Sequence, residues 1–386
     1  MPPIRLNRRH FLGCSAAAGW ALSQGRDVEG ALGLPPSRLG LIGLGNRGTT
    51  LLRAALELPS AAVVAVCDPE ARQRNRALGI AEKATGRRPD ALQDPGAIPD
   101  RRDLDAVLVA LPCDLHFSVY RDALRAGKHL YAEKPLALSL AQCDTLIAEA
   151  DSRPELVVHV GFQRRSNPRF REGVELIQAG ELGTLIEGRA SWTSSNGPVN
   201  GSGGWLARRQ RSGDWMVEQA VHVWDLFAWI AGGPPIRAHG LGRRDVFAEV
   251  QPDRDVTDHY RATLEWADGF HLSFVQSWVD PADDAFTGNV QRVVGTAGGF
   301  DCGTGKVTFR DRSRPRRSIH PGNLPDTKFA LQGFLDALRT ESPAPPPLTL
   351  AEARDATLTG LLVRKAVDER RTVTIEEVLA ETDGPA

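Results

Sequence analysis

The sequence predicts an α/β protein: an N-terminal Rossmann domain followed by an α+β domain with an open, mostly antiparallel sheet. Up to about residue 155, short apolar strands alternate with amphipathic helices, which is typical of a parallel sheet with right-handed crossovers. After that point the alternation stops and extended stretches dominate. A chain of 386 residues is long enough for two domains. We therefore expect a Rossmann domain over 36–155 and a substrate and oligomerisation domain over 156–386.

Composition limits the class of partner. The formal net charge is -1, with 47 basic and 48 acidic residues, so there is no electrostatic reason to bind nucleic acid or an anionic membrane. No apolar run is long enough to span a bilayer. The five cysteines are scattered without CxxC spacing, which indicates neither a disulfide framework nor a zinc site. We expect small, neutral partners, no membrane insertion and no metal.

The first 33 residues form a separate segment. "NRRHFLGCSAAAGWALSQG" joins Arg8 and Arg9 to Phe11, Leu12 and a small, weakly apolar stretch, and resembles a twin-arginine export signal. The alternative is a disordered basic terminus. A lipoprotein cleavage box at Cys14 is discounted because too few apolar residues precede it. We expect residues 1–33 to be a signal and linker that sends the folded protein to the periplasm or otherwise out of the cytoplasm.

A glycine motif opens the first domain. "RLGLIGLGNRG" places Gly43-x-Gly45-x-x-Gly48 between a strand and a helix, and the next strand, "AAVVAVCD", ends at Asp68, twenty residues further on. This arrangement predicts a dinucleotide site, the alternative being a glycine-rich turn without a ligand. Asp68 would accept from the ribose hydroxyls and repel a 2′-phosphate, which predicts NAD in preference to NADP. The expected cofactor-binding residues here are Gly43, Leu44, Gly45, Asn46, Arg47, Gly48 and Asp68.

Three later strands end at the same edge of the predicted sheet. They are "LDAVLVALP", "GKHLYAEKP" and "LVVHVGFQRR". Ligands of parallel sheets lie beyond the strand C-termini. We therefore add to the cofactor-binding residues Leu111, Pro112, His116, Glu133, Lys134 and Gln163, and we expect Arg164 at the same edge.

Lys134 is a candidate for proton transfer. Because a free lysine has a pKa of about 10.4, that role requires burial or a nearby cation to lower the pKa by several units. The alternative is a surface ion pair with Glu133. Adjacent strand residues point to opposite faces, which disfavours that pair.

The second domain is predicted as strands with one buried helix. Ala267-Asp268-Gly269 between two alternating runs indicates a hairpin. A C-terminal helix is expected from "TLAEARDATLTGLLVRKAVDE", and an apolar helix from "GDWMVEQAVHVWDLFAWIAGG". At helical spacing, Glu218, His222 and Asp225 of the latter share one face. Buried ionisable groups are costly unless paired, so this triad is a structural network or a site. Its spacing tolerates a metal, but the clustered ligands of a closed metal site are missing.

Together these motifs resemble the glucose-fructose oxidoreductase/inositol dehydrogenase (Gfo/Idh/MocA) family. The resemblance rests on GLGNRG, Asp68, "AGKHLYAEKPLA", "GFQRRSNP" and the apolar helix, and it covers nearly the whole chain after the signal. It implies that Lys134 and His222 surround the nicotinamide and the reacting carbinol, with Glu218 as the third catalytic residue. Glu218 stands where the family usually has aspartate, which puts the proton acceptor at that position in doubt. Asp225 is expected to have an orienting or structural role.

Three functions follow from the resemblance. The first is an exported NAD-dependent oxidoreductase that acts on a sugar or sugar derivative and retains its cofactor, because an extracytoplasmic compartment lacks an exchangeable pool. The second is an NAD-dependent glycoside hydrolase that uses transient oxidation and elimination. The third is a non-catalytic NAD-binding module, against which intact Lys134 and His222 argue. We also expect a homo-oligomer formed through the C-terminal sheet. The expected substrate-binding residues, whose tryptophans could equally be core or interface, are Arg164, Trp192, Trp205, Trp215, Glu218 and His222.

Overall fold

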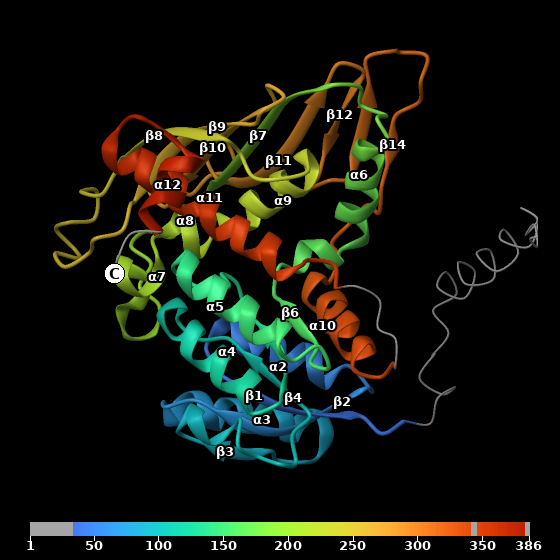
Figure 1. The fold of residues 1–386 in the computed structure, drawn as a ribbon, viewed down its shortest axis with the longest axis vertical. Coiled ribbons are helices and arrows are strands. Elements are labelled where there is room, and N and C mark those ends of the chain that lie inside the picture. Colours follow the sequence, from blue (N-terminus) through green and yellow to red (C-terminus); the bar gives the residue numbers. More distant parts are fainter. Residues whose placement is uncertain (1–33, 341–345, 383–386) are drawn as a thin grey trace, which may run out of the picture. The chain divides into compact units, whose positions relative to one another are not determined.

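The protein is described by a computed structural model over residues 34–340 and 346–382 (Figure 1). The expected export signal, with Cys14, lies outside the described residues. Residues from Ser37 onward form one compact unit. All of the following concerns this unit.

The first sheet has six strands in the order β3-β2-β1-β4-β5-β6, and every neighbouring pair is parallel. This confirms the predicted Rossmann fold, in which strand order reverses beside β1 and leaves a crevice at the strand C-termini. The strands are β1 (Ser37–Ile42), β2 (Ala61–Cys67), β3 (Asp90–Leu92), β4 (Ala106–Val109), β5 (His129–Ala132) and β6 (Val158–Val160). The sequence-based domain boundary at 155 lies in front of β6, which pairs with β5 in this sheet.

Helices cover both faces of the first sheet (Figure 1). Those that follow its strands are α2 (Asn46–Leu56), α3 (Ala71–Thr85), α4 (His116–Arg125) and α5 (Leu140–Asp151), with short 3-10 turns η2 (Pro95–Ala97) and η3 (Cys113–Leu115). A further helix, α10 (Asp326–Ala337), comes from the far end of the sequence and packs against α2. Its buried Leu331 and Phe334 join the same core cluster as Leu51 of α2. The sequence reading did not single out this helix.

The second sheet has nine strands in the order β14-β13-β12-β11-β7-β10-β9-β8-β15. Only β7 and β10 pair in parallel, so the prediction of an open, mostly antiparallel sheet is confirmed. The expected hairpin joins β9 to β10. The strands are β7 (Leu185–Thr193), β8 (Arg237–Arg243), β9 (His259–Glu265), β10 (His271–Ser277), β11 (Gly288–Gly295), β12 (Gly298–Asp301), β13 (Lys306–Phe309), β14 (Arg317–Ser318) and β15 (Thr372–Thr374).

Side chains along β7, β9 and β10 alternate between buried and exposed. The buried side carries α9 and α11, which lie between the two sheets (Figure 1). The C-terminal helix α11 docks on α5, α8, α9 and β8, as its position in the sequence suggested. The remaining elements of this domain are η4 (Gln163–Ser166), α6 (Pro168–Gln178), η5 (Ser202–Ala207), α7 (Arg209–Ser212), α8 (Trp215–Glu218), α9 (Val221–Ala231), α11 (Leu350–Glu369) and α12 (Ile375–Thr382).

The expectation of one continuous helix through Glu218 and His222 is wrong. The helix breaks at Gln219 and Ala220, which separate α8 from α9. Ala220 N donates five residues back to Trp215 O, and His222 N donates only three residues back, to Gln219 O at 3.3 Å. The Glu218 carbonyl therefore has no helical donor from His222, and Glu218 and His222 do not follow regular helical spacing.

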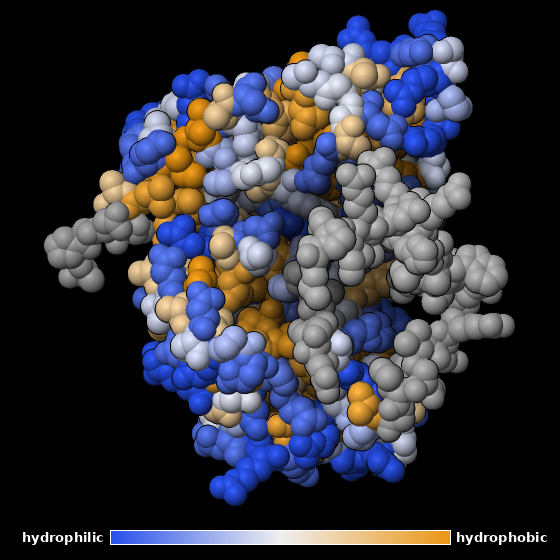
Figure 2. Space-filling model, turned by 45° about the vertical axis from the view of Figure 1, so that its right-hand side comes forward, coloured by the Kyte–Doolittle hydropathy of each residue, from blue (hydrophilic) through white to orange (hydrophobic). Residues whose placement is uncertain are grey.

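On the face shown in Figure 2, hydrophobic residues form separate patches among hydrophilic ones. Within the described ranges, no helix is both long enough and apolar enough to cross a membrane. The four described cysteines, Cys67, Cys113, Cys143 and Cys302, are buried and form no disulfide.

Candidate active site

The glycine turn after β1 is shaped to hold a phosphate. Gly43 has φ +86, and a Cβ on it would lie 2.2 Å from Ala110 O. A Cβ on Gly48 would lie 1.8 Å from Gly43 O, so both positions require glycine. Gly45 is different: a Cβ there would point into open space. Gly45 is also the N-cap of α2 and supplies no capping side chain, so first-turn N–H groups of α2 are left to bind an anion. These features fit the pyrophosphate of a dinucleotide.

Asp68 follows β2 at the position expected for the ribose. Its Oδ2 accepts from Leu44 N at 2.8 Å and its Oδ1 accepts from Glu70 N at 2.9 Å. These bonds fix the carboxylate beside the glycine turn and leave lone pairs for a ribose diol. Arg74 donates to the Asp68 carbonyl, and not to its carboxylate. The residues therefore fit NAD.

Arg47 and Glu133 pair with each other. Arg47 Nε donates to Glu133 Oε1 at 2.6 Å, and Arg47 Nη1 donates to Thr327 Oγ1 of α10 at 2.7 Å. The side chain of Arg47 is thus directed toward Glu133, and its backbone N–H remains for the cofactor. Glu133 is buried and pairs with Arg47, whereas Lys134 pairs with Glu218, so the alternative of a Glu133–Lys134 surface pair is wrong.

Pro112 and His116 shape the turn after β4. His116 lies between two carbonyl oxygens, with Nδ1 2.7 Å from Pro135 O and Nε2 3.0 Å from Leu111 O. Burial lowers the pKa of His116, so its neutral ring has one N–H and donates to only one of them. His116 therefore connects the turn after β4 to the turn after β5, while the backbone of Leu111 and Pro112 borders the cofactor crevice.

Lys134 bonds Glu218 across the two domains. Its Nζ lies 2.8 Å from Glu218 Oε1 and 2.6 Å from Glu218 O, the carbonyl released by the helix break. Burial of Lys134 disfavours its ammonium form and by itself would lower the pKa. The negative charge of Glu218, with smaller effects of Cys113 and Glu133, outweighs burial, so the pKa of Lys134 is raised. The lowered pKa that proton transfer by Lys134 would require is therefore not found. Lys134 is a fixed cation that can donate hydrogen bonds and stabilise negative charge.

His222 is the buried group of the site that is able to accept a proton. Burial lowers its pKa well below 6.5, and the charges of Lys134, Arg164 and Arg47 lower it further. Its Nδ1 is buried and has no hydrogen-bond partner among the described residues. The ring is held edge-to-face by Phe162 at 5.8 Å and flanked by Trp192 at 6.2 Å. A neutral imidazole with an unpartnered nitrogen has the properties of a general base.

Asp225 belongs to a different network. Its carboxylate accepts two hydrogen bonds at 2.8 Å and 3.0 Å from Arg165, and both side chains are almost fully buried. Arg165 also bonds Glu352 of α11 at 3.0 Å and lies 4.6 Å over the Trp229 ring. The three residues of the expected triad therefore do not act together. Glu218 pairs with Lys134, whereas Asp225 of α9 pairs with Arg165 of η4, which also bonds Glu352 of α11. This agrees with the structural role expected for Asp225.

Gln163 and Arg164 follow β6 at the cofactor edge. The Oε1 atom of Gln163 is buried and finds no donor among the described residues. A buried acceptor without a donor costs about 1–3 kcal/mol, and the carboxamide of a nicotinamide would supply a donor. Arg164 Nη1 donates to His222 O at 3.0 Å, and its guanidinium lies 5.7 Å over the Trp192 ring. Arg164 therefore supports His222 and Trp192.

The three tryptophans occupy different places. Trp192, at the end of β7, lies beside His222. Trp215 is buried against the Trp278 ring at 4.6 Å. Trp205 lies in η5, where its indole fills the space beside Gly201. Of the three, Trp192 lies beside His222.

Several site residues were missed by the sequence reading. Gln219 Oε1 accepts from Gln276 Nε2 at 2.5 Å, and Gln276 Oε1 accepts from Tyr260 Oη at 2.9 Å. Arg211 Nε donates to Asp114 Oδ2 at 3.0 Å. These partners are distant in the sequence and have no recognisable spacing, so only the fold brings them together.

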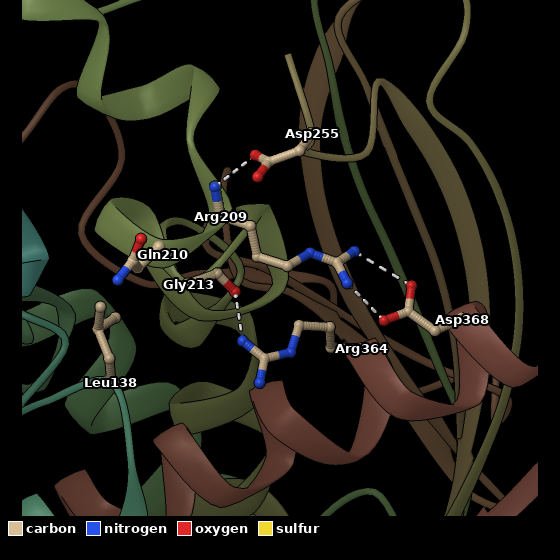
Figure 3. Close-up of a pocket in the computed structure, with 7 residues that line it drawn as sticks. All are labelled: Leu138, Arg209, Gln210, Gly213, Asp255, Arg364 and Asp368. Atoms are coloured by element: carbon tan, nitrogen blue, oxygen red, sulfur yellow. Dashed lines mark hydrogen bonds and ion pairs between the residues drawn. The ribbon is translucent and has the colours of Figure 1, made fainter. Parts of the chain in front are cut away.

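One hollow among the described residues is lined by other side chains. This cavity of about 520 Å³ is lined by Leu138, Arg209, Gln210, Gly213, Asp255, Arg364 and Asp368 (Figure 3). Arg209 pairs with Asp368, and Arg364 donates to Gly213 O. Its ionic groups thus bind one another, and neither Lys134 nor His222 lines it. In the part of the chain that the structure describes, no group of three or more His, Cys, Asp or Glu residues is placed to hold a metal.

Known proteins match this arrangement over most of the chain. The family model "Oxidoreductase family, NAD-binding Rossmann fold" (GFO_IDH_MocA) matches residues 37–162, and the GFO/IDH/MocA C-terminal domain model matches residues 170–301. Together they cover more than half of the sequence. Myo-inositol 2-dehydrogenase of Thermotoga maritima is 26% identical over 359 residues, which are 89% of this chain and 99% of that protein.

Two further similarities bear on function and fold. The 2,7-anhydro-N-acetylneuraminate hydratase of Mediterraneibacter gnavus is 27% identical over 60% of this chain and 61% of its own length. The crystal structure of scyllo-inositol dehydrogenase from Lactobacillus casei, with bound NAD(H) and scyllo-inositol, superposes with a TM-score of 0.71 at 17% identity over 88% of this chain and 99% of that one. The chain therefore belongs to the GFO/IDH/MocA family and is an NAD(P)-dependent oxidoreductase whose Rossmann domain binds NAD.

Proposed function

We propose that the protein oxidises a ring hydroxyl of a sugar or cyclic polyol by hydride transfer to a retained NAD. The observation that carries this proposal is that the Lys134–Glu218 pair, at the cofactor edge of the first sheet, lies close enough to the buried His222 for the Lys134 charge to help lower the pKa of His222 and keep it neutral. Relatives named as inositol dehydrogenases support the substrate class.

The residues divide the work of a carbinol oxidation. His222 Nδ1 takes the hydroxyl proton as the general base, because its lowered pKa keeps it neutral. The Lys134 ammonium donates a hydrogen bond to the same oxygen and stabilises its developing negative charge. Glu218 holds Lys134 in place and keeps it protonated. NAD, when bound, supplies the hydride acceptor at C4 of its nicotinamide.

Two contacts support retention of the cofactor. Glu70, two residues beyond Asp68 at the ribose end of the crevice, accepts a hydrogen bond from Ser202 of η5. Asp114, two residues beyond Pro112 at the nicotinamide end, pairs with Arg211 of α7 at 3.0 Å. The segment from Ser202 to Arg211 thus contacts the first domain at two points beside the expected cofactor crevice, and we propose that these contacts slow the release of a dinucleotide bound there.

The experiment is to purify the protein without added cofactor, identify the dinucleotide it carries and measure its release. We expect bound NAD and oxidation of a member of a sugar and inositol panel. Arg211→Ala should release NAD faster by a factor of up to about five, the effect expected when a partly exposed ion pair is lost. Arg208→Ala is the matched control, because Arg208 pairs with Asp253 of its own domain. Equal release from both variants would contradict retention by this segment, and bound NAD without turnover would favour a binding module.

A second candidate is an NAD-dependent glycoside hydrolase. Similarity to a hydratase favours it, since a hydratase adds water without net oxidation. Oxidation of a carbinol to a ketone would acidify the neighbouring C–H, loss of that proton would expel the glycosidic oxygen, and water addition and hydride return would complete the cycle. A free sugar carrying solvent deuterium next to the oxidised carbon, without net reduction of NAD, would identify this activity. An oxidised sugar would identify the first.

We further propose that the protein is exported in folded form. Arg8, Arg9, Phe11 and Leu12 at the start of a small, weakly apolar stretch support this, and a retained cofactor suits a compartment without an exchangeable pool. Replacing Arg8 and Arg9 together by lysine should leave the protein in the cytoplasm. Unchanged fractionation would contradict a twin-arginine signal.

We also propose that the exposed face of the second sheet pairs with a second copy of the chain. A shallow hollow on this face is bordered by Arg189, Ser191, Arg261, Thr263 and Ser273. Ser273→Arg would add a cation beside Arg261 on both copies, so sedimentation should shift toward the 41.9 kDa monomer. A monomeric wild-type protein would contradict the pairing.

A further inference from the structure

One rung of the second sheet faces the catalytic residues. The strand register sets Gln276 of β10 opposite Tyr260 of β9 on one side and opposite Trp192 of β7 on the other. Residues opposite one another in neighbouring strands project to the same face of a sheet. Tyr260 and Gln276 are each only 1% exposed, and Trp192 lies beside His222, so this rung is on the covered face.

A hydrogen-bond chain runs along the rung toward the site. Tyr260 Oη donates to Gln276 Oε1 at 2.9 Å, and Gln276 Nε2 donates to Gln219 Oε1 at 2.5 Å. Both polar groups of the buried Gln276 amide are thereby engaged. Turning that amide away would leave buried polar atoms unpaired, at a cost of about 1–3 kcal/mol each. The orientation of the Gln219 amide is therefore fixed by its hydrogen bond from Gln276.

Gln219 occupies the break between α8 and α9, between Glu218, which holds Lys134, and His222. Its carbonyl oxygen is taken by Gln276, and none of the described residues accepts a hydrogen bond from its NH2 group. The side chain is only partly buried. The hydrogen-bond chain thus ends in a pre-oriented amide donor next in sequence to Glu218, and Trp192, which is opposite Gln276 in the sheet, lies beside His222.

We propose that Gln219 determines specificity by donating a hydrogen bond to one hydroxyl of the substrate ring, with Gln276 and Tyr260 as positioning residues behind it and Trp192 as the apolar wall. This inference rests on the proposed oxidation of a polyhydroxylated ring, and it identifies the side chain that distinguishes one ring hydroxyl of the substrate. A site built to bond one hydroxyl rejects an analogue that lacks it far more strongly than an apolar pocket rejects a size change.

The test uses the NAD-loaded protein. The probes are myo-inositol, scyllo-inositol and D-glucose, followed by the monodeoxy analogues of whichever is oxidised best. Wild-type kcat/KM should fall about 10- to 100-fold for one monodeoxy analogue in particular. Gln219→Leu should raise KM for the parent compound by a similar factor, change kcat little and abolish the discrimination against that analogue.

Tyr260→Phe provides the second variant, because it removes one oxygen and keeps the ring. It should weaken the same discrimination partly and leave the NAD content unchanged, whereas a merely structural role would lower activity on every analogue alike. Gln332→Leu, on the distant α10, is the matched control and should behave as wild type.

The outcomes separate this inference from the proposed function. If the wild type oxidises a probe and Gln219→Leu lowers kcat/KM equally for parent and analogues, the role of Gln219 is contradicted and the proposed oxidation stands. If the wild type neither oxidises nor binds any probe, both are overturned.

Discussion

Lys134 Nζ lies 2.8 Å from Glu218 Oε1 and 2.6 Å from Glu218 O, so one ammonium joins the end of β5 to a break in a helix 84 residues further along the chain. The longer carboxylate, in the position where the family usually has aspartate, binds the lysine directly. Its side-chain oxygen is thereby engaged with a cation, and in the mechanism that we propose the proton acceptor is His222. The account of the site depends on this division of roles.

The charge of Lys134 should be visible in the pH dependence of activity. His222 acts as a base when neutral, so kcat/KM should fall on the acid side only well below pH 6.5. Lys134→Met removes a cation that lowers the pKa of His222, and the acid limb of its residual activity should move upward. A pH profile of kcat/KM checks this. An acid limb that stays in place would contradict the coupling of the two groups.

Gly45 and Gly79 offer a matched pair for the cofactor turn. A Cβ would enter open space at either position. At Gly45, where a pyrophosphate is expected, Gly45→Ala should raise the Kd for NAD about tenfold or more without loss of stability. Gly79→Ala, inside α3, should leave NAD affinity unchanged and raise stability by up to about 1 kcal/mol. Calorimetric titration of NAD into the cofactor-free protein distinguishes them, and equal affinities would place the pyrophosphate elsewhere.

Asp225 should matter for stability. Replacing Asp225 leaves the buried Arg165 with the partly exposed Glu352 as its remaining counter-ion, so Asp225→Asn should lower the free energy of unfolding by up to about 3–5 kcal/mol. The control is Asp245→Asn, whose partner Arg243 is exposed and whose stability should stay close to that of the wild type. Urea unfolding measures both. A wild-type stability for Asp225→Asn combined with lost turnover would instead assign Asp225 to the chemistry.

His159 should make the fold sensitive to acid. It is buried against the Tyr131 ring, and burial lowers its pKa to about 4. The unfolded chain binds a proton near pH 6.5 and the folded protein does not, so stability is lost as the pH falls below 6.5. Between pH 7 and pH 5 this loss is about 2 kcal/mol for His159 alone. Urea unfolding of the cofactor-free protein measures this. Between pH 7 and pH 5, the free energy of unfolding of His159→Phe should fall by about 2 kcal/mol less than that of the wild type. An equal fall in both proteins would contradict a neutral buried ring.

The sequence predicted the parts of the fold whose signals are local. Strand and helix alternation, the spacing from Gly43 to Asp68 and the hairpin at Asp268 each depend on neighbouring residues. The structure bears them out as the six-stranded parallel sheet and the β9–β10 hairpin. The parallel sheet also brought the strand ends with Pro112, Lys134 and Gln163 to one edge, because topology alone dictates that edge.

Other features depend on tertiary contacts and could not be predicted from neighbouring residues in the sequence. The apolar periodicity around Glu218 and His222 continues without interruption across the helix break, so the sequence pattern does not indicate the break. In the structure, the Glu218 carbonyl accepts a hydrogen bond from the Lys134 ammonium. Helix α10 packs on α2 although some 280 residues separate their partners. The direction of the Lys134 pKa shift depended on a carboxylate that the sequence places far away, since burial and pairing act in opposite directions.

The most direct test of the catalytic assignment is a single-turnover measurement on the NAD-loaded protein with its best polyol. The absorbance of reduced nicotinamide reports hydride transfer. His222→Asn and Lys134→Met should each slow this step by about 10²- to 10⁴-fold while the bound NAD content stays at the wild-type level. Wild-type rates in both variants would contradict the account and leave the Lys134–Glu218 contact as a structural link between the two domains.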